Sequence, residues 1–352
     1  MDEILKKLME PSNFSEIVED AKKLSKRKFI EFTYGIFGED ARDWSSLWNI
    51  PIIPTYECDT LINKELSEDE EDVVLDAIEE TIESQIDSNT EAACIPFEYF
   101  MDPNGKIYDE LIQDSIKNED YSCAIFYYIP KLKELIKRFV KLEAEQTNYG
   151  ELKTKITNYI AKVFTHERCH ANAIYRIDEN KTTIYGARGI YDEVEEQEKY
   201  TFYIEQDEVL TDTVAMMMQR YKYGESIEDC LLKVIESRGG KNPYEDMDDR
   251  MVLLLMSLFP EEITRWEVLG SHEERYNNLL AQKAEEVFGS HSEFARNIEE
   301  TAGNYFRTMD KTGLTKEQWE KRLKMLELMN VKIESIVQPK EKAKNDEDNF
   351  ER

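Results

Sequence analysis

Cysteine and histidine are scarce in this chain of 352 residues, which contains five cysteines and four histidines. The cysteines are scattered without a close CxxC pair, and this arrangement argues against a disulfide framework and against a zinc site built from thiolates. Long apolar runs are also missing, because no stretch approaches the roughly 20 residues of a membrane-spanning helix. The first residues show neither the apolar core nor the cleavage site of a secretory signal. We therefore expect a cytoplasmic protein with no membrane partner.

Basic residues are in short supply, since 45 lysines and arginines face 75 aspartates and glutamates, giving a net charge of −30. A surface field of this sign repels phosphate backbones, so nucleic acid is not an expected partner. Such acidity suits neutral or cationic partners, and it also serves solubility alone. Hydrophobic residues make up 41% of the chain, which is enough for one large core or two smaller ones. The composition indicates a globular protein and leaves its oligomeric state open.

Helical periodicity dominates the pattern of apolar residues, which favours a predominantly helical α+β fold. Two short helices are expected over residues 1–32, separated at Pro11 and capped by Ser12 or Ser15. The segment 44–56 contains two prolines and is expected to be extended. Further helices are predicted over 67–86, 130–142, 158–173 and 207–221, and over most of 227–337 with breaks at glycines and prolines. Strands are predicted over 123–129, 173–177, 182–185 and 200–204.

The most specific pattern in the chain is the run His166-Glu167-Arg168-Cys169-His170. On a helix, residues i and i+4 lie on one face, so the two imidazoles can converge on a single ion while Glu167 projects beside it. Neutral imidazole nitrogens bind zinc well, and a catalytic site needs a third protein ligand and an open position for water. We therefore expect His166 and His170 to bind one zinc ion per chain.

Chance and a purely structural role are the two other interpretations of this run. With only four histidines in the chain, a chance match to the spacing is expected on the order of half a percent of the time. In the structural alternative, both histidines are hydrogen-bonded core residues at the end of an apolar stripe. That stripe consists of Ile156, Tyr159, Ile160 and Val163. Ionisable groups in a core are costly without partners, and a metal ion would supply one.

The run HERCH, followed by the segment DEVLTD from Asp207 to Asp212, resembles the glutamate-zincins, the class of zinc metallopeptidases that includes thermolysin. The resemblance implies that Glu208 is the third zinc ligand. It also implies that Asp212, four residues later, forms a hydrogen bond with a ligating histidine and that Glu167 is the general base. The segment is similar to the NEGLTE stretch of small bacterial members, which carry a hairpin and glycines between the two helices, as Gly186 and Gly189 do here.

The resemblance covers roughly residues 155–222 and shows two departures. Val209 stands where a glycine is common. The interval of 38 residues from His170 to Glu208 is longer than in thermolysin-like enzymes. These departures bear on the subfamily, not on the expected zinc chemistry.

Helical geometry supports Glu208 independently, because Glu208, Asp212 and Ala215 share one face and the small Ala215 permits close helix approach. The alternative is that Glu208 belongs to a solvated acidic face, since Glu198 and Glu205 lie nearby in the sequence. The same geometry turns Cys169 away from the histidine face and predicts a packed thiol. Candidates for stabilising a developing oxyanion are His272, His291, Tyr200 and Tyr203.

Together, these patterns predict a zinc metallopeptidase that hydrolyses peptide or protein substrates through a zinc-activated water and Glu167. The expected division is an N-terminal mixed helical lobe (1–118), a zincin-like catalytic core (119–225), a C-terminal helical lobe (226–337) and a polar tail (338–352). Two alternatives remain: a zinc-bearing scaffold or interaction protein without proteolytic activity, and a hydrolase of a non-peptide amide or ester.

Overall fold

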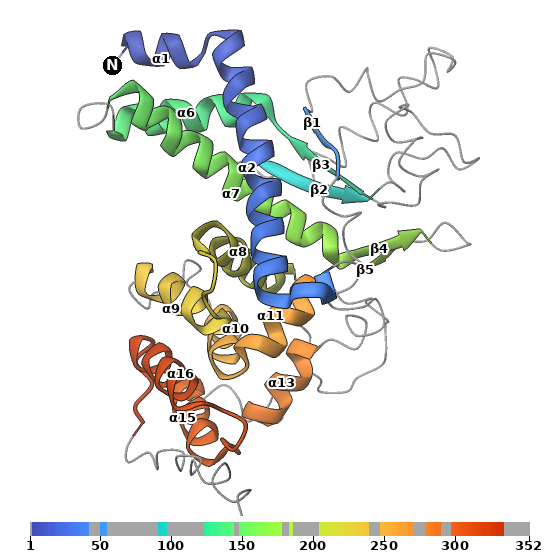
Figure 1. Ribbon diagram of the computed structural model, residues 1–352, viewed down its shortest axis with the longest axis vertical. Coiled ribbons are helices and arrows are strands. Elements are labelled where there is room, and N and C mark those ends of the chain that lie inside the picture. The colour runs from blue at the N-terminus through green and yellow to red at the C-terminus, as the bar shows by residue number, and fades with distance from the viewer. Residues whose placement is uncertain are drawn as a thin grey trace, which may run out of the picture.

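The computed structural model describes residues 2–41, 50–54, 91–96, 123–143, 148–177, 183–185, 204–238, 247–269, 279–289 and 297–333. Most of these residues are helical, and the strands form one small sheet and one hairpin. Figure 1 shows the N-terminal helices and the sheet at one end of the long axis and the C-terminal helices at the other. The prediction of a predominantly helical α+β protein is confirmed at this level, and the zincin-like core remains a prediction.

The three-stranded sheet is built around the predicted apolar strand. Strand β3 (Cys123–Tyr127) lies in the centre, with β1 (Ile52–Pro54) parallel on one side and β2 (Ala92–Pro96) antiparallel on the other. Helix α6 (Ile129–Glu143) follows β3 at once, as expected. Of the two prolines in the predicted extended segment, Pro54 ends the edge strand β1 and Pro51 directly precedes it, positions where a missing backbone donor is tolerated. Even so, the Pro51 carbonyl accepts a hydrogen bond of 2.9 Å from the Ile125 amide.

The N-terminal region contains helices α1 (Asp2–Leu8) and α2 (Pro11–Phe37), and α2 corrects the prediction of two short helices. Pro11 lies at the first helical position, where its lack of an N–H costs nothing, so it starts a helix of 27 residues. The cap position belongs to Glu10 without a side-chain cap, so neither predicted serine serves as the cap. The helix ends only at Gly38, with φ +60°.

The predicted hairpin after the HERCH run is present. Helix α7 (Tyr149–Ala173) leads into β4 (Ile174–Ile177) and the antiparallel β5 (Thr183–Tyr185), and α8 (Ile204–Arg220) follows. Helix α7 begins nine residues before the predicted start, where the Asn148 side chain accepts a 3.0 Å hydrogen bond from the Glu151 amide. Most of the strand expected over 200–204 lies outside the described residues, and Ile204 itself begins α8.

The C-terminal part is helical, as predicted. Its described helices are α9 (Ile227–Ser237), α10 (Met247–Leu258), α11 (Pro260–Leu269), α13 (Leu279–Phe288), α15 (Ile298–Thr308) and α16 (Lys316–Leu328). The expected breaks at Pro260 and Gly289 are confirmed, since Pro260 opens α11 and Gly289 has φ +76° just after α13. The breaks expected at 239–240, 243 and 270, the acidic helix 67–86 and the tail 338–352 lie outside the described residues.

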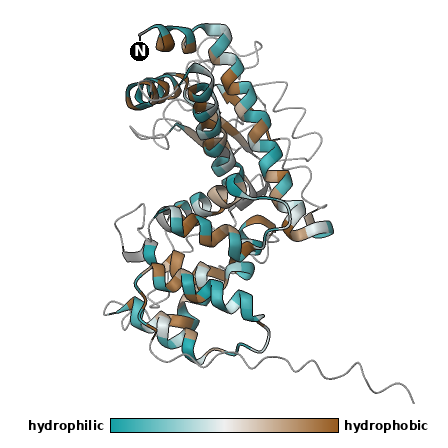
Figure 2. Ribbon diagram, turned by 60° about the vertical axis from the view of Figure 1, so that its left-hand side comes forward, coloured by the Kyte–Doolittle hydropathy of each residue, from teal (hydrophilic) through white to brown (hydrophobic). Residues whose placement is uncertain are grey.

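The buried apolar side chains form two clusters, and helices α2 and α7 contribute to both. One cluster joins α1, the first part of α2, the sheet, α6 and most of α7, whereas the other joins the end of α2 to α8 and the C-terminal helices. Figure 2 shows the two-sided character of the helices, with apolar and polar stripes along the same ribbon. In the described part of the chain, no helix combines the length and apolarity that crossing a membrane requires. The predicted lobe boundaries remain predictions.

Candidate metal centre

The candidate site begins with helix α7, whose apolar stripe holds the HERCH run in place. Ile156, Ile160 and Phe164 are fully buried on this stripe. Because residues four apart share a face, His166 and His170 continue along the helix as neighbours. Their ring centroids are 4.6 Å apart at an interplanar angle of 78°. Helix α8 packs beside α7 (Figure 1) and brings Glu208 to the two rings.

Two imidazole nitrogens and the two oxygens of one carboxylate meet here, with three nearly equal separations between them. Nε2 of His166 lies 2.9 Å from Oε2 of Glu208, and Nε2 of His170 lies 3.0 Å from Oε1. The two Nε2 atoms are 3.0 Å apart. His170 is almost fully buried, whereas the Glu208 side chain is 34% exposed, so the group is reached from the glutamate side. The structure therefore brings together the three predicted ligands in a group that could hold a metal ion.

These three contacts cannot all be favourable hydrogen bonds. If both Nε2 atoms carry a proton, both rings donate to Glu208, but their N–H groups then face each other at 3.0 Å. If one Nε2 is bare, its lone pair faces an ionised carboxylate oxygen at 2.9 or 3.0 Å. A cation between them would accept a lone pair from each residue. The separations are near the roughly 3.3 Å edge of a tetrahedron with zinc bonds of 2.0–2.1 Å, so the residues fit a metal.

Protonation of Glu208 would also relieve this conflict, but the surroundings oppose it. Burial raises the pKa of the Glu208 carboxyl, while the charge of His170 and hydrogen bonds with His166 and His170 lower it. The lowering contributions prevail and hold this pKa well below the usual range of a glutamate. Glu208 is therefore ionised at neutral pH, which is the form that binds a metal ion.

Glu167, the predicted general base, lies next to the triad without joining it. Its Oε1 is 4.0 Å from Nε2 of His166, and its side chain is 8% exposed. A carboxylate at this distance can reach a water molecule at the triad while leaving the ligand positions to other side chains. Cys169 is fully buried in the C-terminal core cluster, in agreement with its expected role as a packed thiol.

Asp212 lies on the far side of His166, one helical turn after Glu208. Its Oδ1 is 3.9 Å from Nδ1 of His166, the ring nitrogen that does not face Glu208. This distance is longer than a hydrogen bond, so the expected direct bond to a ligating histidine is not formed. Instead, the carboxylate forms ion pairs of 2.5 Å with Lys162 and with Arg238. Neither cation was predicted from the sequence, although Lys162 stands four residues before His166 and so shares its face.

A buried polar network, also missed from the sequence, fixes α7 between α2 and α8. Thr165 donates to the Ala161 carbonyl at 2.7 Å and lies 3.1 Å from Ser25 Oγ. Gln219 of α8 donates to Thr165 Oγ1 at 2.7 Å, and Arg168 donates to Ser25 Oγ at 3.2 Å. The sequence offers one sign of this network, which is Ser25 in the middle of the apolar face of α2. A buried polar residue on such a face needs a hydrogen-bond partner.

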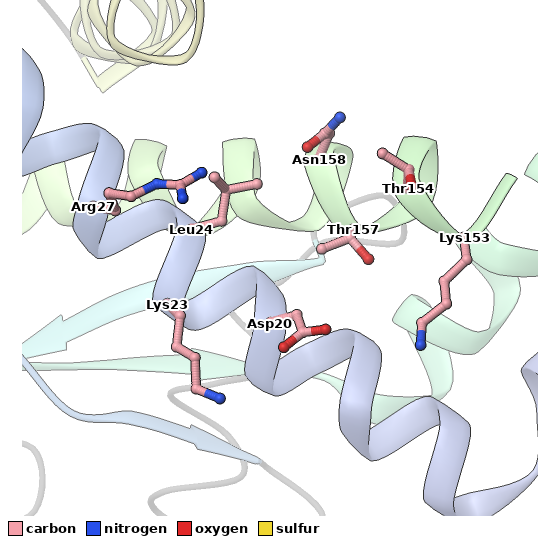
Figure 3. A pocket seen from close by; sticks show the side chains of 8 residues that line it. All are labelled: Asp20, Lys23, Leu24, Arg27, Lys153, Thr154, Thr157 and Asn158. Atoms are coloured by element: carbon pink, nitrogen blue, oxygen red, sulfur yellow. The ribbon is translucent and has the colours of Figure 1, made fainter. Parts of the chain in front are cut away.

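A cleft of about 430 Å³ opens between α2 and α7, away from the triad. Figure 3 shows the residues that line it: Asp20, Lys23, Leu24, Arg27, Lys153, Thr154, Thr157 and Asn158. Asn158 lies eight residues, or about 12 Å along the helix, before His166. Two of the lining cations are near acidic groups, with Lys153 Nζ 2.8 Å from Glu16 and Arg27 Nε 3.7 Å from Glu31. No predicted site residue lines this cleft.

The four candidates for oxyanion stabilisation, His272, His291, Tyr200 and Tyr203, all lie outside the described residues. Comparisons of the chain with protein-family models, with curated proteins and with solved structures find no match. The glutamate-zincin resemblance therefore rests on the local motifs alone, and what can be argued about function comes from the geometry of the triad and its neighbours.

Proposed function

We propose that this protein is a zinc-dependent metallopeptidase whose ion is held by His166, His170 and Glu208. The observation that supports the proposal most is the set of three mutual separations of 2.9–3.0 Å among the two imidazoles and the carboxylate. Two nitrogens and one oxygen are a ligand set that suits zinc, and a three-residue set leaves one tetrahedral position for water. Both histidines come from one helix and the glutamate from another, which is the arrangement that the sequence resemblance implies.

In the proposed reaction, zinc would polarise a water molecule and the scissile carbonyl. Glu167 accepts a proton from that water, and its carboxylate is suitably placed because Oε1 lies 4.0 Å from Nε2 of His166. The same carboxyl group then donates the proton to the leaving amine, which returns Glu167 to its ionised form. Asp212 holds negative charge behind His166 and favours the orientation in which Nε2 faces Glu208.

The test is a paired measurement of zinc content and peptide cleavage on wild type and Glu167→Gln. The substitution preserves shape and hydrogen bonding but removes the proton acceptor, so zinc content should stay at one ion per chain. Cleavage should fall by roughly 10²- to 10⁴-fold, the usual loss when general acid–base catalysis is removed. Glu151→Gln, an exposed change in the first turn of the same helix, is the matched control and should change neither quantity.

Each outcome of this experiment decides between the alternatives. A Gln variant that holds zinc and cleaves at the wild-type rate would contradict the role of Glu167. A wild-type protein that binds zinc but cleaves no peptide in a broad library would favour the zinc-bearing scaffold, or a hydrolase of a non-peptide amide that a small-molecule amide screen would detect. A wild-type protein that binds no zinc would overturn the proposal as a whole.

A further inference from the structure

Lys162 occupies the same face of α7 as His166, one helical turn earlier. Its ammonium group forms an ion pair of 2.5 Å with Oδ1 of Asp212, and its side chain is 31% exposed. The pair joins α7 to α8 directly beside the triad, because Asp212 lies one turn after Glu208. Lys162 is thus attached to the same two helices that carry the candidate metal ligands.

Both oxygens of Asp212 are held by cations from different elements. Lys162 forms an ion pair with Oδ1, and Arg238, at the end of α9, forms an ion pair of 2.5 Å with Oδ2. Arg238 also donates to Thr213 Oγ1 at 3.0 Å, which fixes the guanidinium against α8. The two cations oppose rotation of the carboxylate, and the oxygen held by Lys162 is the one that faces Nδ1 of His166, 3.9 Å away.

The mostly buried Asp212 carboxylate has another acid, Glu208, one turn earlier on the same face of its helix. Without its cations, it would carry uncompensated charge in a poorly solvated position and could turn toward a bound metal ion. The ion pairs to Lys162 and Arg238 therefore compensate this charge and hold the carboxylate in a fixed orientation.

We infer that Lys162 is a positioning residue for the metal centre, which acts by holding Asp212 Oδ1 toward Nδ1 of His166. The inference rests on the proposed metal site. Arg238 performs the matching task at Oδ2, so two cations hold the carboxylate with its charge 3.9 Å from Nδ1 of His166. From there it favours one ring orientation electrostatically, not through a direct hydrogen bond. The effect of both cations on the metal would then pass through Asp212.

This role of Lys162 predicts whether its removal strengthens or weakens metal binding. A lysine that acted only through its charge would repel a divalent cation, so its removal should strengthen metal binding. A lysine that positions Asp212 should have the opposite effect, because loss of a group that orients a ligating histidine typically weakens affinity by about 10- to 100-fold. The direction of the change in affinity therefore separates positioning from simple electrostatics.

The experiment is a cobalt(II) titration, followed by visible absorption of the protein, on four chains: wild type, Lys162→Met, Asp212→Asn and the double variant. We expect Lys162→Met to weaken cobalt binding about 10-fold in the wild-type background, at the low end of the range for such partners. In the Asp212→Asn background, the same change should not weaken binding further. Lys162→Arg should restore affinity. Lys155→Met, which changes an exposed lysine of the same helix α7 that pairs with Glu143 of α6, should leave it unchanged.

Tighter or unaltered binding by Lys162→Met in the wild-type background would overturn the inference and leave the metal site standing. Equal losses in both backgrounds would also overturn it, because the lysine would then act independently of Asp212. Misfolding is recognised by circular dichroism and by failure of the Lys162→Arg chain to recover. A wild-type chain that binds no cobalt would instead refute the proposed metal site together with this inference.

Discussion

Zinc should stabilise the folded chain, because the three candidate ligands come from segments that unfolding separates. His170 and Glu208 are 38 residues apart in the sequence, yet their side chains lie 3.0 Å apart in the fold. Binding that requires the native arrangement raises the free energy of unfolding by RT ln(1 + [L]/Kd). At free zinc 100-fold above the dissociation constant, the gain is about 2.7 kcal/mol, and each further tenfold rise adds about 1.4 kcal/mol.

The assay is urea denaturation at a series of buffered free zinc concentrations, with wild type and Glu208→Ala side by side. If loss of Glu208 weakens zinc 100-fold, then at the concentration that gives wild type 2.7 kcal/mol the variant gains only about 0.4 kcal/mol. Magnesium should produce little change, because it prefers oxygen ligands and the triad offers two nitrogens.

Two results would refute this reasoning. A Glu208→Ala chain with the full zinc-dependent gain would remove Glu208 from the ligand set and direct attention to the other acids of that region, Glu198 and Glu205. A wild-type chain whose stability does not respond to zinc would mean that the close contacts of the two histidines with Glu208 are not a metal site at all.

Two further predictions concern the fold around the site. The pKa of Asp229 is lowered, because Lys321 and Ser226 outweigh the raising effect of burial. Its contribution to stability is therefore complete above the unfolded pKa near 3.9 and is lost as pH falls through the lower folded pKa. Asp229→Asn should cost about 0.5 kcal/mol at pH 7, as expected for a partly exposed ion pair, and urea denaturation should show no difference below the folded pKa. Gly35→Ala places a Cβ 2.0 Å from Tyr221 Oη and should cost about 1–3 kcal/mol by overpacking, a loss that Tyr221→Phe should partly reverse in the same denaturation assay if the clash is the cause.

The hairpin and its two flanking helices were predictable from the sequence, because each is specified locally. The apolar period of α7 and the alternation of the strand that follows are visible without knowledge of the fold. The triad was predictable for the same reason, since the spacing of His166 and His170 fixes their common face. Predicting Glu208 required one more step, the assumption that its helix packs beside α7. The spacing of four residues between Glu208 and Asp212, which resembles that of the glutamate-zincins, supported this assumption.

The surroundings of the triad were not predictable, because they depend on contacts between distant segments. Nothing near Arg238 in the sequence indicates that it reaches Asp212, 26 residues earlier. The same holds for Ser25, which pairs with Thr165 across 140 residues. The length of α2 was missed for a local reason, since Pro11 was interpreted as a break although proline is favoured at the first position of a helix.

The candidate metal centre lies on a helix, α7, that packs against both cores. Ile156, Ile160 and Phe164 pack in the cluster with the sheet, whereas Cys169 packs in the cluster with α8 and the C-terminal helices. Ala171, two residues after Cys169, packs again with the sheet cluster, so α7 contacts both cores over the HERCH run. A site at such a junction is rigid on the α7 side, because both cores hold that helix. Its third ligand depends on how α8 packs against α7, and two interactions join these helices: the Lys162–Asp212 ion pair and the Thr165–Gln219 hydrogen bond. Arg238 in turn ties Asp212 to the end of α9.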